Sequence, residues 1–179
     1  LGLVYDITLE PIAHQEELAN AKACQEVFSD ATDFTDVQTD LDTLNQNLKE
    51  NGLEYVTVDA VMEASDDSGQ MLGYVLTVTD SEGYGGDIQL SMGIRMDGTL
   101  NGISILSISE TAGLGMNADT DAFKSQFADK NVEQFTYTKN GASADNEIDA
   151  ISGATITTNA VTNGVNGGLL TFQYLKGGN

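Results

Sequence analysis

The chain has 179 residues, of which 40% are hydrophobic; this is enough to bury a core, and we expect residues 1–179 to form a single domain. Its 28 acidic and 7 basic residues give a formal net charge of -21, which argues against nucleic acid or an anionic membrane surface as a direct partner and leaves a solvated acidic surface or a docking face for a cationic partner. One cysteine and one histidine are too few for a zinc, haem or iron–sulfur site, so no metal site is predicted.

The N-terminal part of the chain predicts helices separated by a polar loop. The sequence begins at Leu1 without a methionine and has no apolar run near the roughly 18 residues of a membrane helix, so we expect a piece of a longer protein with residues 1–10 as a linker. Apolar residues at helical spacing predict helices over residues 11–28 and 37–48. The Asp- and Thr-rich residues 29–42 predict a solvated loop, with a calcium loop as the lesser alternative because the central glycine of an EF-hand is missing.

From residue 53 the hydrophobic period becomes two, which predicts strands. Two hairpins are expected, one joined by the turn at Asp66 to Gly69 and the other by Asp97-Gly98. Asn101-Gly102 falls within the last of these strands and predicts a bulge. The four predicted strands cover residues 53–64, 71–79, 88–96 and 99–109.

The C-terminal third predicts a return to helix. We expect a short helix over residues 121–128, a strand over 132–138, a loop over 140–146 and a long helix over 157–174. Three glycines within the long helix each cost about 1 kcal/mol relative to alanine, which indicates close approach to a sheet or a ring, or fraying near the chain end. The whole pattern predicts an α+β fold, with an antiparallel sheet of hairpins packed against N-terminal and C-terminal helices.

The stretch DAISGATITTNAV, residues 149–161, has the composition of a helix N-terminus that could hold a phosphate. Ser152 and Gly153 allow a sharp turn, and Thr155 and the threonines that follow place hydroxyls where a helix exposes unpaired N–H groups. Those donors and the helix dipole favour an anion. No lysine or arginine lies in the stretch, so backbone donors would hold the phosphate; an ordinary helix cap is the alternative.

Two glycine-rich stretches upstream could receive a flat ring. They are Gly83-Tyr84-Gly85-Gly86 and Ser109-Glu110-Thr111-Ala112-Gly113-Leu114-Gly115. Glycines let backbone N–H groups approach a ring, while Tyr84 or Leu114 could cover its face and Glu110 and Thr111 could bond its polar edge. Each stretch taken alone is also typical of a plain turn.

The motif at residues 149–155, followed by Thr157 and Thr158, resembles the flavinylation motif of the FMN-binding domain shared by the G subunit of the Rnf complex and the C subunit of the sodium-pumping NADH:quinone reductase. The upstream stretches resemble that family's glycine turn and its Ser-Glu-Thr-Pro-Gly-Leu-Gly loop, with Ala112 in place of proline. The resemblance implies FMN bound covalently through a phosphoester on Thr155. It places the cofactor site at Thr155, Ser152, Gly153, Ala154, Thr157, Thr158, Asp149, Tyr84, Gly85, Gly86, Glu110, Thr111, Gly113, Leu114 and Gly115.

The resemblance also implies an electron-transfer subunit of a membrane-bound, ion-translocating ferredoxin:NAD oxidoreductase. Its partners would be the other membrane subunits and a flavin transferase that attaches the FMN, and the isolated domain would have no turnover and no catalytic residue of its own. A membrane helix would precede residue 1, with the domain on the extracytoplasmic side. The alternatives are the C subunit of the quinone reductase and, in a different class, a non-redox extracytoplasmic binding module.

Overall fold

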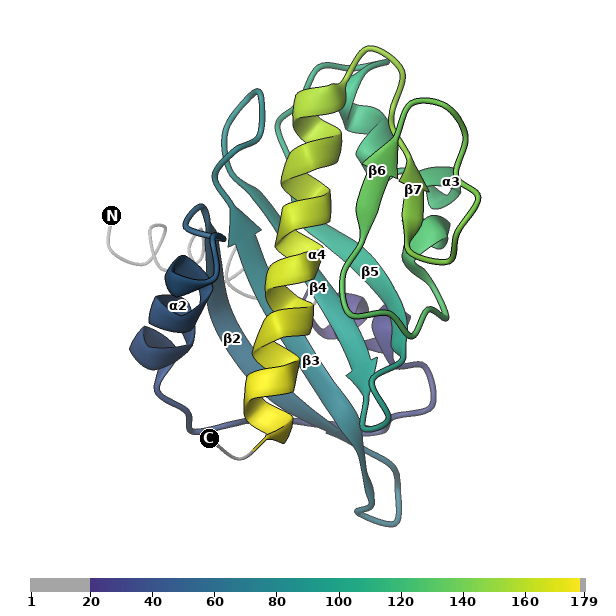
Figure 1. Cartoon of the computed structure of the whole chain (residues 1–179). Coiled ribbons are helices and arrows are strands. Elements are labelled where there is room, and N and C mark those ends of the chain that lie inside the picture. Colours follow the sequence, from purple (N-terminus) through teal and green to yellow (C-terminus); the bar gives the residue numbers. More distant parts are fainter. Residues whose placement is uncertain (1–19, 178–179) are drawn as a thin grey trace, which may run out of the picture.

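The computed structural model describes residues 20–177, whose strands form a five-stranded antiparallel sheet in the order β1-β2-β3-β4-β5 (Figure 1). The strands are β1 (Asp33–Asp36), β2 (Val56–Ser65), β3 (Met71–Asp80), β4 (Ile88–Arg95) and β5 (Leu100–Ser107). The predicted hairpins and the α+β class are confirmed. The β4–β5 register shifts by one residue opposite Asn101, which is the predicted bulge.

The polar stretch predicted as a loop over residues 29–42 instead contains a strand. β1 pairs with β2 at the sheet edge, with Phe34 opposite Ala64. Only the half-buried Phe34 interrupts its run of exposed polar residues, so the local pattern held no strand signal. Pairing with a strand that lies far along the chain therefore overrode the local composition.

One face of the sheet is covered by helices α4 (Thr155–Lys176) and α2 (Leu41–Glu50) (Figure 1). α4 packs against β2, β3 and β4, and its apolar side chains join the main core. A Cβ on Gly167 would lie 2.5 Å from Val56 Cγ1, and one on Gly168 would overlap Met92 Sδ. These two glycines are therefore required by close approach to the sheet, one of the explanations that the sequence left open.

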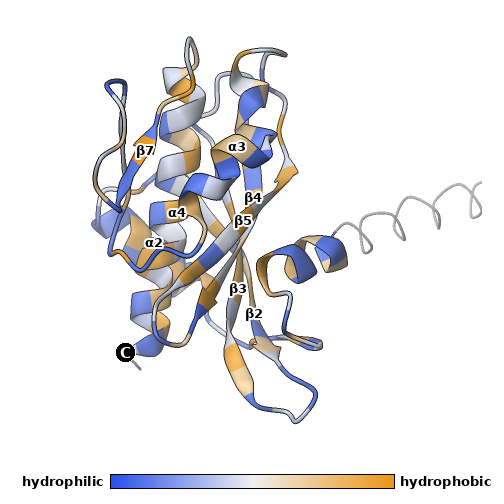
Figure 2. Cartoon of the chain, turned by 90° about the vertical axis from the view of Figure 1, so that its right-hand side faces the viewer, coloured by the Kyte–Doolittle hydropathy of each residue, from blue (hydrophilic) through white to orange (hydrophobic). Residues whose placement is uncertain are grey.

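The other face of the sheet carries the end of the first helix. Residues 20–27 are helical, while residues 11–19 of that predicted helix and the predicted linker, 1–10, lie outside the described residues. Phe28 is fully buried on this face with Val75, whereas the next residue, Leu76, faces α4. Figure 2 shows α4 on the opposite side of the sheet from the helix that ends at Val27.

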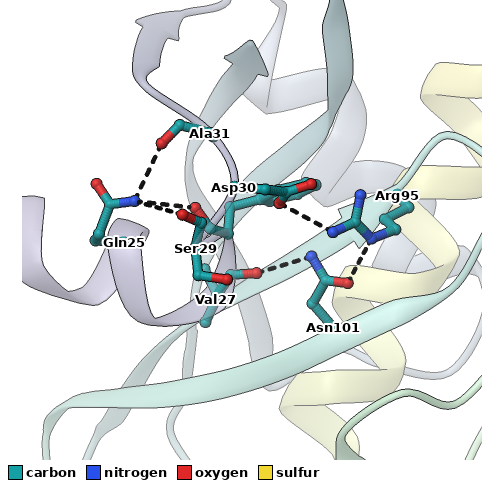
Figure 3. A network of polar contacts seen from close by, with 8 residues as sticks. Gln25, Val27, Ser29, Asp30, Ala31, Arg95 and Asn101 are labelled. Carbon is teal, nitrogen blue, oxygen red and sulfur yellow. Dashed lines mark hydrogen bonds and ion pairs between the residues drawn. The ribbon is translucent and has the colours of Figure 1, made fainter. Parts of the chain in front are cut away.

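A polar network fixes this N-terminal segment to the sheet (Figure 3). Arg95 on β4 forms an ion pair with Asp30 at 2.9 Å, and its guanidinium lies 5.2 Å from the centre of the Phe28 ring. Asn101 on β5 accepts from Arg95 Nε at 2.8 Å and donates to the Val27 carbonyl at 3.0 Å. The segment is therefore held by hydrogen bonds to two strands as well as by apolar burial.

The residues between β5 and α4 form short elements. The predicted helix over 121–128 is divided into α3 (Asp121–Lys124) and the 3-10 turn η2 (Ser125–Phe127), preceded by a further turn, η1 (Gly115–Asp119). The predicted strand over 132–138 shortens to β6 (Thr136–Thr138), which pairs in parallel with β7 (Glu147–Asp149), a strand the sequence did not predict. None of the helices in residues 20–177 is both long and apolar enough to span a bilayer.

Candidate functional site

Three chain segments meet at the N-terminal end of α4 and enclose a cleft of about 620 Å³. One segment is the β3–β4 loop, the second follows β5, and the third is the turn that leads into α4. This volume is in the range of sites that bury small organic ligands. The lining residues are Tyr84, Thr111, Leu114, Gly115, Gly153, Ala154, Thr155, Ile156 and Thr157.

Helix α4 begins at Thr155 without a side-chain cap, because the side chain of its N-cap residue Ala154 has no oxygen that could accept a hydrogen bond. The first-turn N–H groups have no acceptor within the helix, since the carbonyls four residues earlier precede it. The residue before the cap, Gly153, has a φ of +74°, which L side chains rarely adopt. A tight turn and a row of free donors thus border the cleft at its helical end.

The three threonines of the motif have different roles. Thr155 is half-buried and lines the cleft. Thr158 is fully buried. Its hydroxyl donates to the Ala154 carbonyl at 2.9 Å and accepts from the Ile151 N–H at 3.0 Å, so it stabilises the turn before α4 and does not line the cleft. The Thr158 hydroxyl is therefore bonded to the turn that precedes α4.

The remaining threonine, Thr157, is joined to a glutamate in the second segment. Its hydroxyl donates to Glu110 Oε1 at 2.7 Å. The same carboxylate accepts from the backbone N–H groups of Tyr84 at 2.8 Å and Gly85 at 2.5 Å. Glu110 is not among the lining residues, and its carboxylate joins the segments that form the cleft wall; its predicted bond to the polar edge of a ring stays a prediction.

Glycines allow the three segments to approach one another closely. A Cβ on Gly115 would lie 2.5 Å from Thr157 Oγ1 and 2.7 Å from Glu110 Cβ, and one on Gly85 would overlap the Ser109 carbonyl oxygen. The sequence predicted that these glycines let the backbone approach a ring. In the structure their immediate neighbours are the other segments of the wall.

The rim of the cleft is apolar and exposed. Tyr84 is 71% exposed and Leu114 43% exposed, and the Leu114 side chain would meet a Cβ on Gly153 at 3.1 Å. Ile156 is 53% exposed beside Thr155 and was not predicted as a site residue; its signal was an apolar residue within a polar first helical turn. Large exposed side chains gathered around a cleft are typical of a binding surface.

The other predicted residues lie beside the cleft and not in its lining. Asp149 Oδ1 accepts from the Ala142 N–H at 2.6 Å, and the Gln126 side chain accepts from the Asp149 N–H at 2.7 Å and donates to its carbonyl at 3.3 Å. Asp149 therefore orders the loop before the motif. Gly85, Gly86, Gly113 and Ser152 belong to the turns that carry the lining residues.

A buried acid ends β3 just before the loop that carries Tyr84. Asp80 is 1% exposed; its Oδ1 accepts from the Glu82 N–H at 2.6 Å, while its Oδ2 has no hydrogen-bond partner among residues 20–177. Burial, reinforced by the charges of Glu82 and Asp87, raises its pKa to about 7. Glu82 in turn accepts from Asn163 on α4 at 2.9 Å, which joins this loop to the helix.

The fold and the cleft define an α+β domain with a cleft at a helix N-terminus between two glycine loops. Residues 83–169 match the FMN-binding domain family. The chain is 33% identical over 178 residues to the G subunit of the Na(+)-translocating ferredoxin:NAD(+) oxidoreductase complex of Acetobacterium woodii, covering 98% of this chain and 84% of the relative. It is also 33% identical to the G subunit of the ion-translocating oxidoreductase complex of Methanosarcina acetivorans, covering 90% of this chain and 79% of the relative.

Two solved structures share the fold. The C subunit of the Na(+)-translocating NADH-quinone reductase of Parabacteroides distasonis has a TM-score of 0.56 at 19% identity, covering 91% of this chain and 94% of that one. NqrC of Shewanella oneidensis has a TM-score of 0.55 at 22% identity, covering 66% and 59%. The chain therefore belongs to the FMN-binding domain family of the Rnf G subunit, and the resemblance seen in the sequence is confirmed; with NqrC it shares the fold.

The residues of the cleft fit FMN. Exposed Tyr84 and Leu114 offer apolar surface for a flat ring, and the unpaired N–H groups of the first α4 turn suit a phosphate. No lysine or arginine is among the lining residues, so a phosphate bound in this cleft would depend on backbone N–H donors.

Proposed function

We propose that this chain is the electron-transfer subunit of an Rnf-type ion-translocating oxidoreductase and carries FMN covalently through a phosphoester on Thr155. The observation that carries this proposal is the position of Thr155. It is the first residue of α4 and it lines the cleft whose rim is formed by Tyr84 and Leu114. Membership in the family of the Rnf G subunit supports the redox role.

Each part of the cleft has a task in holding the cofactor. The Thr155 oxygen anchors it, the first-turn N–H groups neutralise phosphate charge, and the apolar rim excludes water from the ring. When bound, FMN supplies one-electron and two-electron redox chemistry that the protein side chains lack. The tether prevents loss of the cofactor from a site open to solvent.

Attachment requires a separate flavin transferase. A threonine hydroxyl is a poor nucleophile without a neighbouring base, and neither histidine nor cysteine lines the cleft. Glu110, the carboxylate beside the cleft, accepts from Thr157 and not from Thr155. The substrate of that transferase would be FAD: its pyrophosphate bond would break, the FMN phosphorus would bond to the Thr155 oxygen, and AMP would leave with the hydroxyl proton. The turn at Ser152 and Gly153 would be part of what the transferase recognises.

The electron partners are the other membrane subunits of the complex, and ferredoxin and NAD would be its overall substrates. The full-length protein would be anchored by an N-terminal membrane helix, with this domain on the extracytoplasmic side. The isolated domain would have no turnover. The two relatives that share 33% identity over most of their length are G subunits, which favours the Rnf assignment over the quinone reductase.

Intact mass spectrometry tests the attachment. The chain is co-expressed with a flavin transferase, and we expect the mass of one FMN minus water on the peptide that holds Thr155. Thr155→Val should carry none, while Thr155→Ser, which keeps a hydroxyl, should still be modified. An adduct on Thr155→Val would show that another hydroxyl is used. A parent chain left unmodified by a transferase that modifies a known substrate would overturn covalent attachment.

A further inference from the structure

One carboxylate joins the three segments that build the cleft. Glu110 lies in the second segment, its two backbone partners, Tyr84 and Gly85, lie in the first, and its third partner, Thr157, lies in the first turn of α4. Hydrogen bonds to an ionised acceptor are the stronger kind. Glu110 is thus bonded to all three walls of the cleft, whereas the bond between Glu82 and Asn163 joins only the first segment to α4.

The steric fit around this carboxylate is equally tight. Gly115 has room for no Cβ, because Thr157 Oγ1 and Glu110 Cβ lie where it would be placed. Gly85 is limited in the same way by Glu110 Oε2, at 2.9 Å from an added Cβ. These walls are therefore in van der Waals contact at the same point where the hydrogen bonds converge.

We propose that Glu110 is a positioning residue, which sets the spacing between the Tyr84 turn and the Thr155 end of α4 and so forms the cofactor cleft before any cofactor arrives. For the cofactor itself this inference rests on the proposed function. Glu110 acts through Tyr84 and Thr157, which line the cleft, and not by binding the ring itself.

The chemistry of the three donors requires a carboxylate and not merely a polar group. Oε1 accepts from the Tyr84 N–H and the Thr157 hydroxyl, and Oε2 accepts from the Gly85 N–H. A glutamine has one oxygen and one NH2 group. In either orientation of the amide, the NH2 group would face a backbone N–H that can only donate. Glu110→Gln therefore leaves at least one of the two turn amides without an acceptor.

The first measurement is hydrogen exchange on the flavin-free chain. We expect exchange at Tyr84 or Gly85 to rise about tenfold or more in Glu110→Gln. Glu54→Gln makes the same charge change at an exposed position with no hydrogen bond among the described residues, and should match the parent. If Glu110→Gln also matches the parent at these two amides, Glu110 does not position the turn.

The second measurement follows the cofactor. In chains loaded by a flavin transferase, Glu110→Gln should change the flavin emission yield and slow the initial rate of attachment. Thr157→Val keeps the Glu110 carboxylate and its bonds to the Tyr84 and Gly85 N–H groups. It therefore tests the bond between Glu110 and α4 by itself, even if Glu110→Gln folds poorly. It should change the emission while leaving exchange at Tyr84 and Gly85 unchanged. Emission of Thr157→Val equal to that of the parent would show that the bond between Glu110 and Thr157 does not position the start of α4.

The two proposals fail in different ways. If the parent chain takes no flavin, the proposed function fails, while exchange at Tyr84 and Gly85 still reports on Glu110. If the parent is modified on Thr155 but Glu110→Gln behaves like Glu54→Gln in both measurements, the positioning inference fails and the proposed function stands.

Discussion

Asp80 is expected to make the stability of the domain fall as the pH rises towards neutrality. Its carboxyl is buried, and one of its oxygens has no hydrogen-bond partner in the described part of the chain. Burial raises its pKa from 3.8 to about 7. The native state therefore keeps the Asp80 proton over a pH range in which the unfolded chain has already released it.

The sign and size of the effect follow from proton linkage. Between pH about 4 and about 7 the native state binds one proton more than the unfolded state, so the free energy of unfolding falls as the pH rises. A pKa difference of about three corresponds to at most about 4 kcal/mol. This contribution is complete at the acid end of the window and is lost when the pH passes the native pKa.

Asp80→Asn isolates this contribution, because it removes the charge and keeps an oxygen that can accept from the Glu82 N–H. Urea unfolding of the parent and the variant is measured from pH about 4 to about 7, and the difference between their free energies of unfolding is plotted against pH. The contributions of the other acidic residues, which both chains share, cancel in this difference. We expect the variant to gain up to about 4 kcal/mol relative to the parent from the acid to the neutral end.

An exposed carboxylate provides the control for this measurement. Asp67 lies in the β2–β3 turn and is exposed, so the curves of Asp67→Asn and the parent should run parallel. If the curves of Asp80→Asn and the parent also run parallel from pH about 4 to about 7, the native pKa of Asp80 is not raised and the reasoning is refuted.

Three further substitutions test the packing of α4 by thermal and urea unfolding. Gly168→Ala should destabilise the domain by about 1–3 kcal/mol, because its methyl group would overlap Met92 Sδ. Gly164→Ala, which has no neighbouring atom closer than 3.6 Å, should be neutral or stabilise the domain by up to about 1 kcal/mol. Equal effects of the two substitutions on stability would contradict this contact geometry. Asn166→Ala should cost about 1–3 kcal/mol, since the side chain accepts from the Phe135 N–H at 2.7 Å and donates to its carbonyl at 2.9 Å, and unchanged stability would show that water replaces these bonds.

Much of the fold was readable because it depends on neighbours in sequence. Alternating side chains predicted β2 to β5, since one face of each strand packs on a core, and Asp97-Gly98 marked the second hairpin. β7 was missed because a three-residue strand that pairs with β6 has no periodicity to detect. β1 was missed for a similar reason, because its pairing with β2 is not encoded in its own residues.

The candidate site was predictable as a set of segments but not as a set of contacts. The motif and both glycine stretches do converge on one cleft, and Tyr84, Leu114 and Thr155 line it. The sequence could not show that Glu110 faces protein donors, because its partners lie 25, 26 and 47 residues away. Nor could it show that Thr158 is turned inward.

By itself, the sequence determined the family, the order of the elements and the threonine at the start of the last helix, because these depend on motifs and on local hydrophobic period. The tertiary structure decided which threonine hydroxyl is bonded to protein and which carboxylate joins the walls of the cleft. Hydrogen-bond partners and steric contacts are set where distant segments meet, and there Thr155 and Thr157 both line the cleft while the Thr157 hydroxyl donates to Glu110.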